Sequence, residues 1–188
     1  MPHHWTVEEY EALVRADILT NDRVELIEGQ LVEKMVKKPE HSASSEGTWR
    51  AIHPVLPSGW HVRIEKPVRI PNRDSEPEPD ISVVRGSHRA WRKREPDPAD
   101  VALVVEVARS SWAPGGDADR SLALTYGGAH IPAYWIINVI DRQIEVYSGP
   151  VEGAYPPRVI VPESGLVDLV IDGQVVAQIP AAELLGTD

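Results

Sequence analysis

The chain has 188 residues, of which 19 are basic and 29 acidic, and a formal net charge of −10 at pH 7. This balance argues against a protein that coats nucleic acid non-specifically, because such binding depends on neutralising phosphates. The absence of cysteine excludes disulfides and cysteine-based zinc sites. Length and a 42% hydrophobic content predict a single domain spanning residues 1–188. Lacking a signal segment or a long apolar stretch, the chain is expected to be cytoplasmic, with no membrane association.

The first part of the chain combines helix and strand patterns. Residues 6–9 fit a capping box, which predicts the start of a helix. Apolar runs at 24–28 and 31–35, separated by a glycine turn, predict a hairpin. A second helix is expected over 40–53, where prolines follow, and a strand over 60–64, where apolar and polar residues alternate.

The later part of the chain is richer in strands. The runs 81–84 and 101–107 are almost wholly apolar, which is typical of strands covered on both faces. A helix is expected over 117–126, before two glycines, and a second hairpin over 133–147. The valine-rich tail from 159 to 185 predicts an added C-terminal hairpin and a closing turn. This order of elements implies an α/β domain with one mixed sheet and helices against it.

Two carboxylates at strand ends stand out. Asp80 opens the 81–84 strand, and Glu106 interrupts the next buried run. An unpaired carboxylate in a dry interior is costly or becomes neutral, so it needs a cation, an arginine or a ligand beside it. The spacing therefore suggests a metal site. A structural ion pair of Glu106 with Arg109 or Arg120 is the alternative.

A basic segment, residues 85–94, follows the Asp80 strand. It holds five arginines and lysines around one tryptophan. Such a surface is suited to holding a phosphate backbone while the aromatic ring stacks on a base. A solvated basic loop is the alternative. The predicted nucleic-acid-binding residues are Arg85, Arg89, Trp91, Arg92, Lys93 and Arg94.

Several short motifs occur in a fixed order along the chain. They are VELIEG at 24–29, EPEPD at 76–80, VVRG at 83–86, VVEV at 104–107, IPAYW at 131–135 and DRQIEVY at 141–147. In order and spacing these motifs resemble the Uma family of restriction endonucleases, a branch of the PD-(D/E)XK nuclease superfamily. The likeness runs from about residue 6 to residue 147.

The resemblance implies a restriction-endonuclease-like core, in which a central mixed sheet is flanked by helices. It implies a divalent cation, Mg²⁺ or Mn²⁺, held by Asp80, Glu106, the backbone carbonyl of Val107 and Glu28. The implied reaction is metal-dependent hydrolysis of DNA phosphodiester bonds, with Asp80, Glu106 and Arg120 as the catalytic residues. DNA is the expected partner, and a homodimer is considered as the assembly.

The chain departs from the family pattern at a lysine that orients the attacking water. The two positions where the superfamily and the family carry it are Ala108 and Leu122 here. Arg120 is the nearest cation on that helix, but its pKa is too high for a base, so it is expected to stabilise charge or position phosphate. Glu25 is the alternative to the hairpin carboxylate named above, and His41 is a candidate phosphate contact.

Three functions remain open. The first is a metal-dependent DNA endonuclease or nickase, and the second is a degenerate relative that binds nucleic acid or a protein without cutting. The third is a hydrolase of a smaller phosphoester. The resemblance favours the first and the missing lysine supports the second. The basic segment supports both over the third, because a small substrate needs no extended cationic surface.

Overall fold

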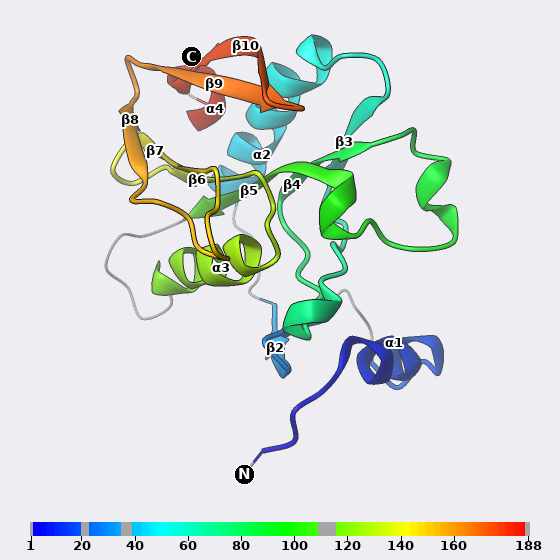
Figure 1. Ribbon diagram of the computed structural model, residues 1–188. Helices are drawn as coiled ribbons and strands as arrows, with labels where there is room; N and C mark the ends of the chain where they lie inside the picture. The colour runs from blue at the N-terminus through cyan, green and yellow to red at the C-terminus, as the bar shows by residue number, and fades with distance from the viewer. Residues whose placement is uncertain (1, 20–22, 35–38, 109–115, 187–188) are drawn as a thin grey trace.

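The protein is described by a computed structural model for residues 2–19, 23–34, 39–108 and 116–186. Its centre is a six-stranded mixed sheet (Figure 1), which confirms the predicted α/β class. The strands lie, from edge to edge, in the order β3 (Trp60–Ile64), β4 (Ile81–Arg85), β5 (Val101–Ala108), β6 (Ala133–Asn138), β7 (Gln143–Ser148) and β8 (Val159–Pro162).

The two innermost strands, β5 and β6, run parallel, and the other four neighbouring pairs are antiparallel. The parallel pair is joined by α3 (Gly116–Gly128), which covers one face of the sheet. Side chains of both strands are buried on both faces, which explains why their sequences are continuous apolar runs and do not alternate.

The opposite face of the sheet is covered by helices α2 (Pro39–Ile52) and α4 (Ala181–Leu185) and by a hairpin of β9 (Leu166–Ile171) and β10 (Gln174–Pro180). These elements share one hydrophobic core with the sheet. The predicted C-terminal hairpin is confirmed. Two features of the tail differ from the prediction: β8 joins the central sheet beside β7, and the chain continues into α4 where a closing turn was expected.

The N-terminal elements form a smaller unit with its own core. They are α1 (Val7–Arg15), β1 (Val24–Ile27) and β2 (Gln30–Glu33). The predicted capping box is present, because the Thr6 hydroxyl accepts from the backbone N–H of Glu9 at 3.2 Å while the Glu9 carboxylate accepts from the backbone N–H of Thr6 at 2.9 Å. Short 3₁₀ turns complete the fold: η1 (His53–Val55), η2 (Pro71–Arg73), η3 (Ala90–Arg92) and η4 (Pro98–Asp100).

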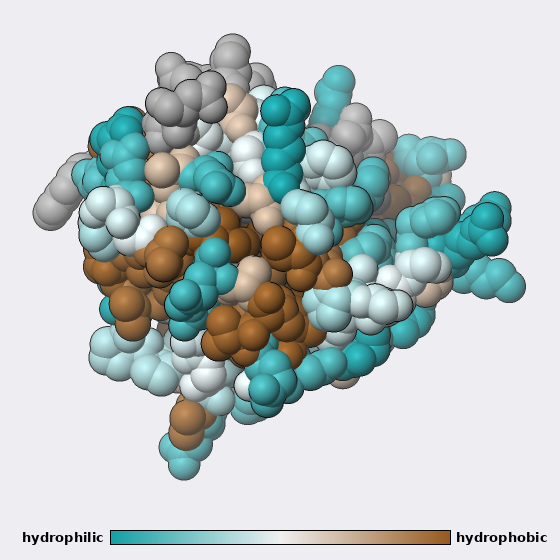
Figure 2. All heavy atoms as spheres, turned by 90° about the horizontal axis from the view of Figure 1, so that it is seen from above, coloured by the Kyte–Doolittle hydropathy of each residue, from teal (hydrophilic) through white to brown (hydrophobic). Residues whose placement is uncertain are grey.

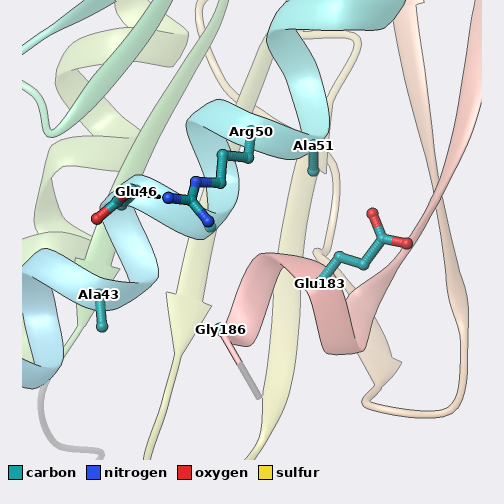
Figure 3. Close-up of a pocket in the computed structure, with 7 residues that line it drawn as sticks. Ala43, Glu46, Arg50, Ala51, Glu183 and Gly186 are labelled. Carbon is teal, nitrogen blue, oxygen red and sulfur yellow. Dashed lines mark hydrogen bonds and ion pairs between the residues drawn. The ribbon is translucent and has the colours of Figure 1, made fainter. Parts of the chain in front are cut away.

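The surface formed by the described residues includes two hollows. A groove of about 640 Å³ lies between the β9–β10 hairpin and the sheet, with Trp60 and Trp135 in its lining. Figure 2 views the molecule from the side of this hairpin and shows hydrophobic side chains gathered there. A second hollow of about 350 Å³ lies between α2 and α4, where Arg50 points toward Glu46 (Figure 3). Neither hollow is lined by the predicted catalytic acids.

The helices of the described residues include none with the length and apolar content needed to cross a membrane.

Glu76 is buried between α1 and the β1–β2 hairpin. Its backbone N–H donates to the carbonyl of Leu26 at 2.7 Å. Its carboxyl Oε2 has no hydrogen-bond partner within the described part of the chain. Burial, followed by the charges of Glu11 and Glu95, raises the pKa of Glu76 to about 7. The attachment of the N-terminal unit therefore includes a carboxyl group that favours its neutral form.

This carboxyl group makes stability depend on pH. The pKa of Glu76 rises from 4.5 to about 7 on folding, so the folded state holds the proton more tightly than the unfolded state. The stability that comes from this protonation is complete below pH 4.5 and is lost as the pH rises through 7. We expect Glu76→Gln, which mimics the protonated group, to raise the free energy of unfolding by up to about 3 kcal/mol near pH 8 and by little at low pH. Urea denaturation across this range measures the effect, with Glu33→Gln, an exposed position, as control. Parallel pH profiles for wild type and Glu76→Gln would contradict the prediction.

Candidate active site

Strand pairing makes the two predicted acids neighbours. β4 pairs with β5 so that Ile81 lies opposite Val105. The next position outward therefore places Asp80 opposite Glu106. The backbone N–H of Asp80 lies 3.4 Å from Oε2 of Glu106 and donates to it. The proximity of the two carboxylates is thus a property of the sheet itself.

Asp80 is buried, and two donors hold one oxygen of its carboxylate. Oδ2 accepts from the backbone N–H of Val107 at 2.8 Å and lies 2.8 Å from Nε2 of His41. His41 is in the first turn of α2 and is 7% exposed, and its Nδ1 has no hydrogen-bond partner among the described residues. This geometry favours the tautomer with the proton on Nε2, because a buried N–H at Nδ1 would be left unpaired.

Glu106 lies in surroundings that disfavour its charge. Its Oε1 accepts a hydrogen bond from the hydroxyl of Tyr126 at 3.2 Å. Burial raises the pKa of Glu106 well above its ordinary value, and the charges of Asp80, Asp119 and Glu25 raise it further. A cation bound here would reverse this effect, because it favours the charged form of each carboxylate.

A third carboxylate reaches the pair from α3. Burial, and then the charge of Asp80, raises the pKa of Asp119 to about 6, although His41 and Arg120 oppose the shift. The backbone carbonyl of Asp119 accepts from the hydroxyl of Tyr134 at 2.7 Å. This bond fixes the beginning of α3 against β6, so the position of Asp119 is set by the sheet.

A fourth carboxylate comes from the hairpin. Oε2 of Glu25 accepts from the backbone N–H of Glu78 at 3.0 Å, two residues before Asp80. The charge of Glu25 also raises the pKa of both Glu106 and Asp119. Four acids from separate elements of the chain therefore share one electrostatic environment.

Two predicted site residues have partners elsewhere. Glu28 is ion-paired with Arg73 at 2.8 Å. Arg120 binds Glu145, not Glu106, through Nε at 3.1 Å and Nη2 at 2.5 Å. The assignments of Glu28 as a metal ligand and of Arg120 as a catalytic cation stay predictions. The geometry of these contacts does not support them.

The two positions expected for a lysine are packed into the fold. Ala108 is buried at the end of β5, and Leu122 of α3 packs against the core on that face of the sheet. Arg109, the other predicted partner of Glu106, lies outside the described residues. Neither packed position holds a cation that faces the acids.

The basic segment lies at the far end of β4 from Asp80, about 17 Å away along a five-residue strand. Arg85 is ion-paired with Asp172 at 2.6 Å. Arg94 lies over the ring of Trp91, 4.8 Å from its centroid, and Trp91 itself packs against a hydrophobic core. The basic side chains of this segment that form no ion pair within the described chain are Arg89, Arg92 and Lys93.

The donor atoms suit a hard divalent cation. Asp80 and Glu106 present adjacent carboxylates, and burial, followed by the charge of Asp80, raises the pKa of Glu106. Mg²⁺ keeps several waters and commonly needs only one or two protein carboxylates. In the described ranges no group of three or more His, Asp or Glu side chains is arranged to hold a metal ion. An ion bound by Asp80 and Glu106 would therefore have to keep several waters.

Comparison with known proteins decides the family. The family described as "Putative restriction endonuclease" (Uma2) matches residues 7–179. The chain belongs to the Uma2 family. This confirms the resemblance predicted from the motifs. It also extends the likeness beyond residue 147 to β8, β9 and most of β10.

A solved structure has the same fold as this Uma2 chain. It is the crystal structure of a protein from Anabaena variabilis described as "a putative nuclease belonging to DUF820". The two share 17% sequence identity and a TM-score of 0.72, over 96% of this chain and 97% of that one. At this identity the likeness shows the fold alone, which is the predicted restriction-endonuclease-like core. The curated proteins include no match to the chain.

Sequence patterns miss part of this Uma2 site. Asp119 resembles an ordinary acid at a helix start, and His41 is marked only as a candidate phosphate contact. One signal for Asp119 is available, because it lies seven residues before Tyr126 and so shares a face of α3 with it. His41 has no such signal, since its contact with Asp80 joins α2 to β4 over a long stretch of chain.

The repulsion among the acids predicts a stabilising substitution. We expect Glu106→Gln to raise the free energy of unfolding by on the order of 1 kcal/mol near pH 9, because it removes a buried charge, and by less near pH 5. The measurement is urea denaturation at both pH values. Equal stability of wild type and variant near pH 9 would contradict the prediction, because the charge of Glu106 would then not destabilise the fold.

Glu145 supplies the matched control on the same sheet. Its side chain is fully buried and bound by Arg120 and Arg158. Burial raises the pKa of Glu145, but hydrogen bonds from Arg120 and Asn138 outweigh this and lower it. We expect Glu145→Gln to reduce the free energy of unfolding by roughly 2 kcal/mol, because it weakens the charge-assisted hydrogen bonds that the buried carboxylate accepts from Arg120 and Arg158.

Proposed function

We propose that the protein is a metal-dependent endonuclease that hydrolyses phosphodiester bonds in DNA. The observation that carries this proposal is the pairing of Asp80 with Glu106 across β4 and β5, in a chain of the Uma2 family. Mg²⁺ is the proposed cofactor, with Mn²⁺ as a substitute, and the carbonyl of Val107 is the proposed third ligand.

A divalent ion at this pair would lower the pKa of a bound water, polarise the phosphate and offset charge on the leaving oxygen. The chain's own residues keep the carboxylates in position for it. His41 and the backbone N–H of Val107 fix Oδ2 of Asp80, and the hydroxyl of Tyr126 fixes Oε1 of Glu106. Carboxylates held in this way need little rearrangement when they bind an ion.

DNA is the proposed substrate, and the basic segment is its proposed second point of contact. Arg89, Arg92 and Lys93 are exposed and follow the far end of β4, which lies about 17 Å from Asp80. A duplex presents phosphates over such a distance, whereas a small phosphoester does not. A homodimer stays a prediction, which sedimentation equilibrium tests.

A specific observation favours a second candidate, a nuclease-fold protein that binds DNA or a protein partner without cutting. The positions expected for a water-orienting lysine hold Ala108 and Leu122, and both pack into the fold. Loss of one positioned transition-state group costs on the order of a hundred- to a thousandfold in rate. Slow nicking therefore agrees with the endonuclease, and no metal-dependent nicking agrees with the second candidate.

The decisive experiment measures metal binding and plasmid nicking in the same variants. We expect wild type to bind Mn²⁺ by calorimetry and to nick supercoiled plasmid slowly. The double variant Asp80→Asn, Glu106→Gln should lose both properties, because both carboxylates become neutral amides. Glu46→Gln, an exposed acid on α2, is the control and should behave as wild type. Identical heats for wild type and the double variant would exclude a metal site at this pair.

The basic segment generates a further prediction. Neutralising Arg89, Arg92 and Lys93 to serine should weaken DNA binding at low salt, because the rest of the surface is mainly acidic. The log–log salt slope should fall in magnitude by roughly two to three, about 0.9 for each phosphate that is no longer neutralised. The control is Arg94→Ser, since this arginine is already paired with Asp97 and Asp100. Unchanged affinity in the triple variant would assign DNA binding to another surface.

A further inference from the structure

We propose that Lys34 supplies the side-chain cation that binds the substrate phosphate beside Asp80 and Glu106. The inference rests on the proposed function and deepens it. It assigns a role to a residue of the hairpin that no motif marks. Three features support it: the position of Lys34, the charge around it and the partners of the neighbouring cations.

Lys34 follows β2 and lies next to the segment that leads to Asp80. Its backbone N–H donates to the carbonyl of Arg23 at 2.9 Å, which extends the hairpin ladder by one residue. Its Nζ lies 2.9 Å from Oε2 of Glu78, and the two side chains are only 15% and 19% exposed. Glu78 is two residues before Asp80, so the positive charge of Lys34 lies near the segment that carries this candidate metal ligand.

Lys34 and Glu25 occupy the same face of the hairpin. Glu25 pairs with Val32, and Lys34 stands two residues beyond Val32. The side chains of Lys34 and Glu25 are therefore diagonal neighbours. Because Glu25 also accepts from the backbone N–H of Glu78, these three side chains form one polar cluster that adjoins the acids of the sheet.

The acids create a charge excess that a phosphodiester has to overcome. In addition to burial, the charges of Asp80, Asp119 and Glu25 raise the pKa of Glu106, so these four acids lie close enough to repel one another. A single divalent ion offsets two of these negative charges, and the phosphate brings another. A further cation within reach of the same point therefore stabilises the bound substrate, and partial burial strengthens its attraction relative to open water.

Among the cations of this region, Lys34 is suited to change partners. Arg120 is bound in a two-point contact to Glu145, whose side chain is fully buried. Moving that guanidinium would take one of two arginine partners away from a buried carboxylate, which is unfavourable. Lysine carries a compact charge on a flexible chain. Lys34 can therefore turn from Glu78 to a phosphate by side-chain rotation, and Glu78 keeps access to water.

The test breaks the ion pair from each side. Binding of a short DNA duplex is measured by fluorescence anisotropy over a range of salt, in Ca²⁺, a hard cation that prefers the same oxygen ligands as Mg²⁺. We expect Lys34→Met to weaken binding about tenfold and to reduce the salt slope by about 0.9, the value for one phosphate contact. We expect Glu78→Gln to bind as well as wild type or better, because Lys34 keeps its charge.

Two controls complete the comparison. Lys34→Arg, which keeps the charge, should retain most of the affinity, and Lys66→Met, an exposed lysine, should match wild type. Equal losses in Lys34→Met and Glu78→Gln would overturn the proposal, because Lys34 would then serve only as the partner of Glu78. An unchanged salt slope in Lys34→Met would also overturn it. Binding is measured without cleavage, so absence of nicking in wild type contradicts the endonuclease while these results still decide the phosphate contact.

Discussion

The pairing of β4 with β5 is the constraint on which the candidate site depends. Side chains alternate between the faces of a sheet, so a slip of one residue would send Asp80 and Glu106 to different sides. The strands pair irregularly between Val83 and Val84, at the end away from the acids. The pairing next to the acids is regular. Apolar side chains of β4 and β5 are buried on both faces of the sheet, and a shift in register would expose some of them.

The sheet contains two kinds of buried carboxylate, and their surroundings separate their roles. Glu145 is surrounded by Arg120, Arg158 and Asn138, so its charge is matched and it joins α3 and the chain after β7 to the sheet. Glu106 is surrounded mainly by other acids, and its charge is opposed. The first arrangement stabilises the fold. The second arrangement disfavours the charge of Glu106, and a cation bound beside it would favour that charge.

Local patterns predicted most of the fold. The capping box, the glycine turns and the apolar runs are signals carried by neighbouring residues, and each corresponds to an observed element. The pair Asp80 and Glu106 was predictable for the same reason, because each acid adjoins a recognisable strand. The position of β8 in the central sheet was not predictable, since a short valine-rich run pairs equally well in a hairpin or at a sheet edge.

The rest of the site depends on contacts between segments far apart in the sequence. His41 and Asp119 approach Asp80 and Glu106 from α2 and α3, and Lys34 contacts Glu78 from the β1–β2 hairpin. No pattern near these residues in the sequence indicates their partners. Sequence proximity was also misleading. The basic segment follows Asp80 closely along the chain, but an extended strand carries it to the opposite end of the sheet.

The C-terminal segment has a consequence for the autonomy of the rest of the chain. β9, β10 and α4 contribute Val167, Leu169, Ile179 and Leu184 to the core that covers one side of the sheet. A chain cut after β7 would expose this apolar surface to water and leave a naked strand edge, a combination that promotes aggregation. The sheet and the C-terminal segment therefore depend on the same hydrophobic core. An inserted residue is best tolerated at the exposed turn of Asp172 and Gly173, where it would disturb only the exposed ion pair of Asp172 with Arg85.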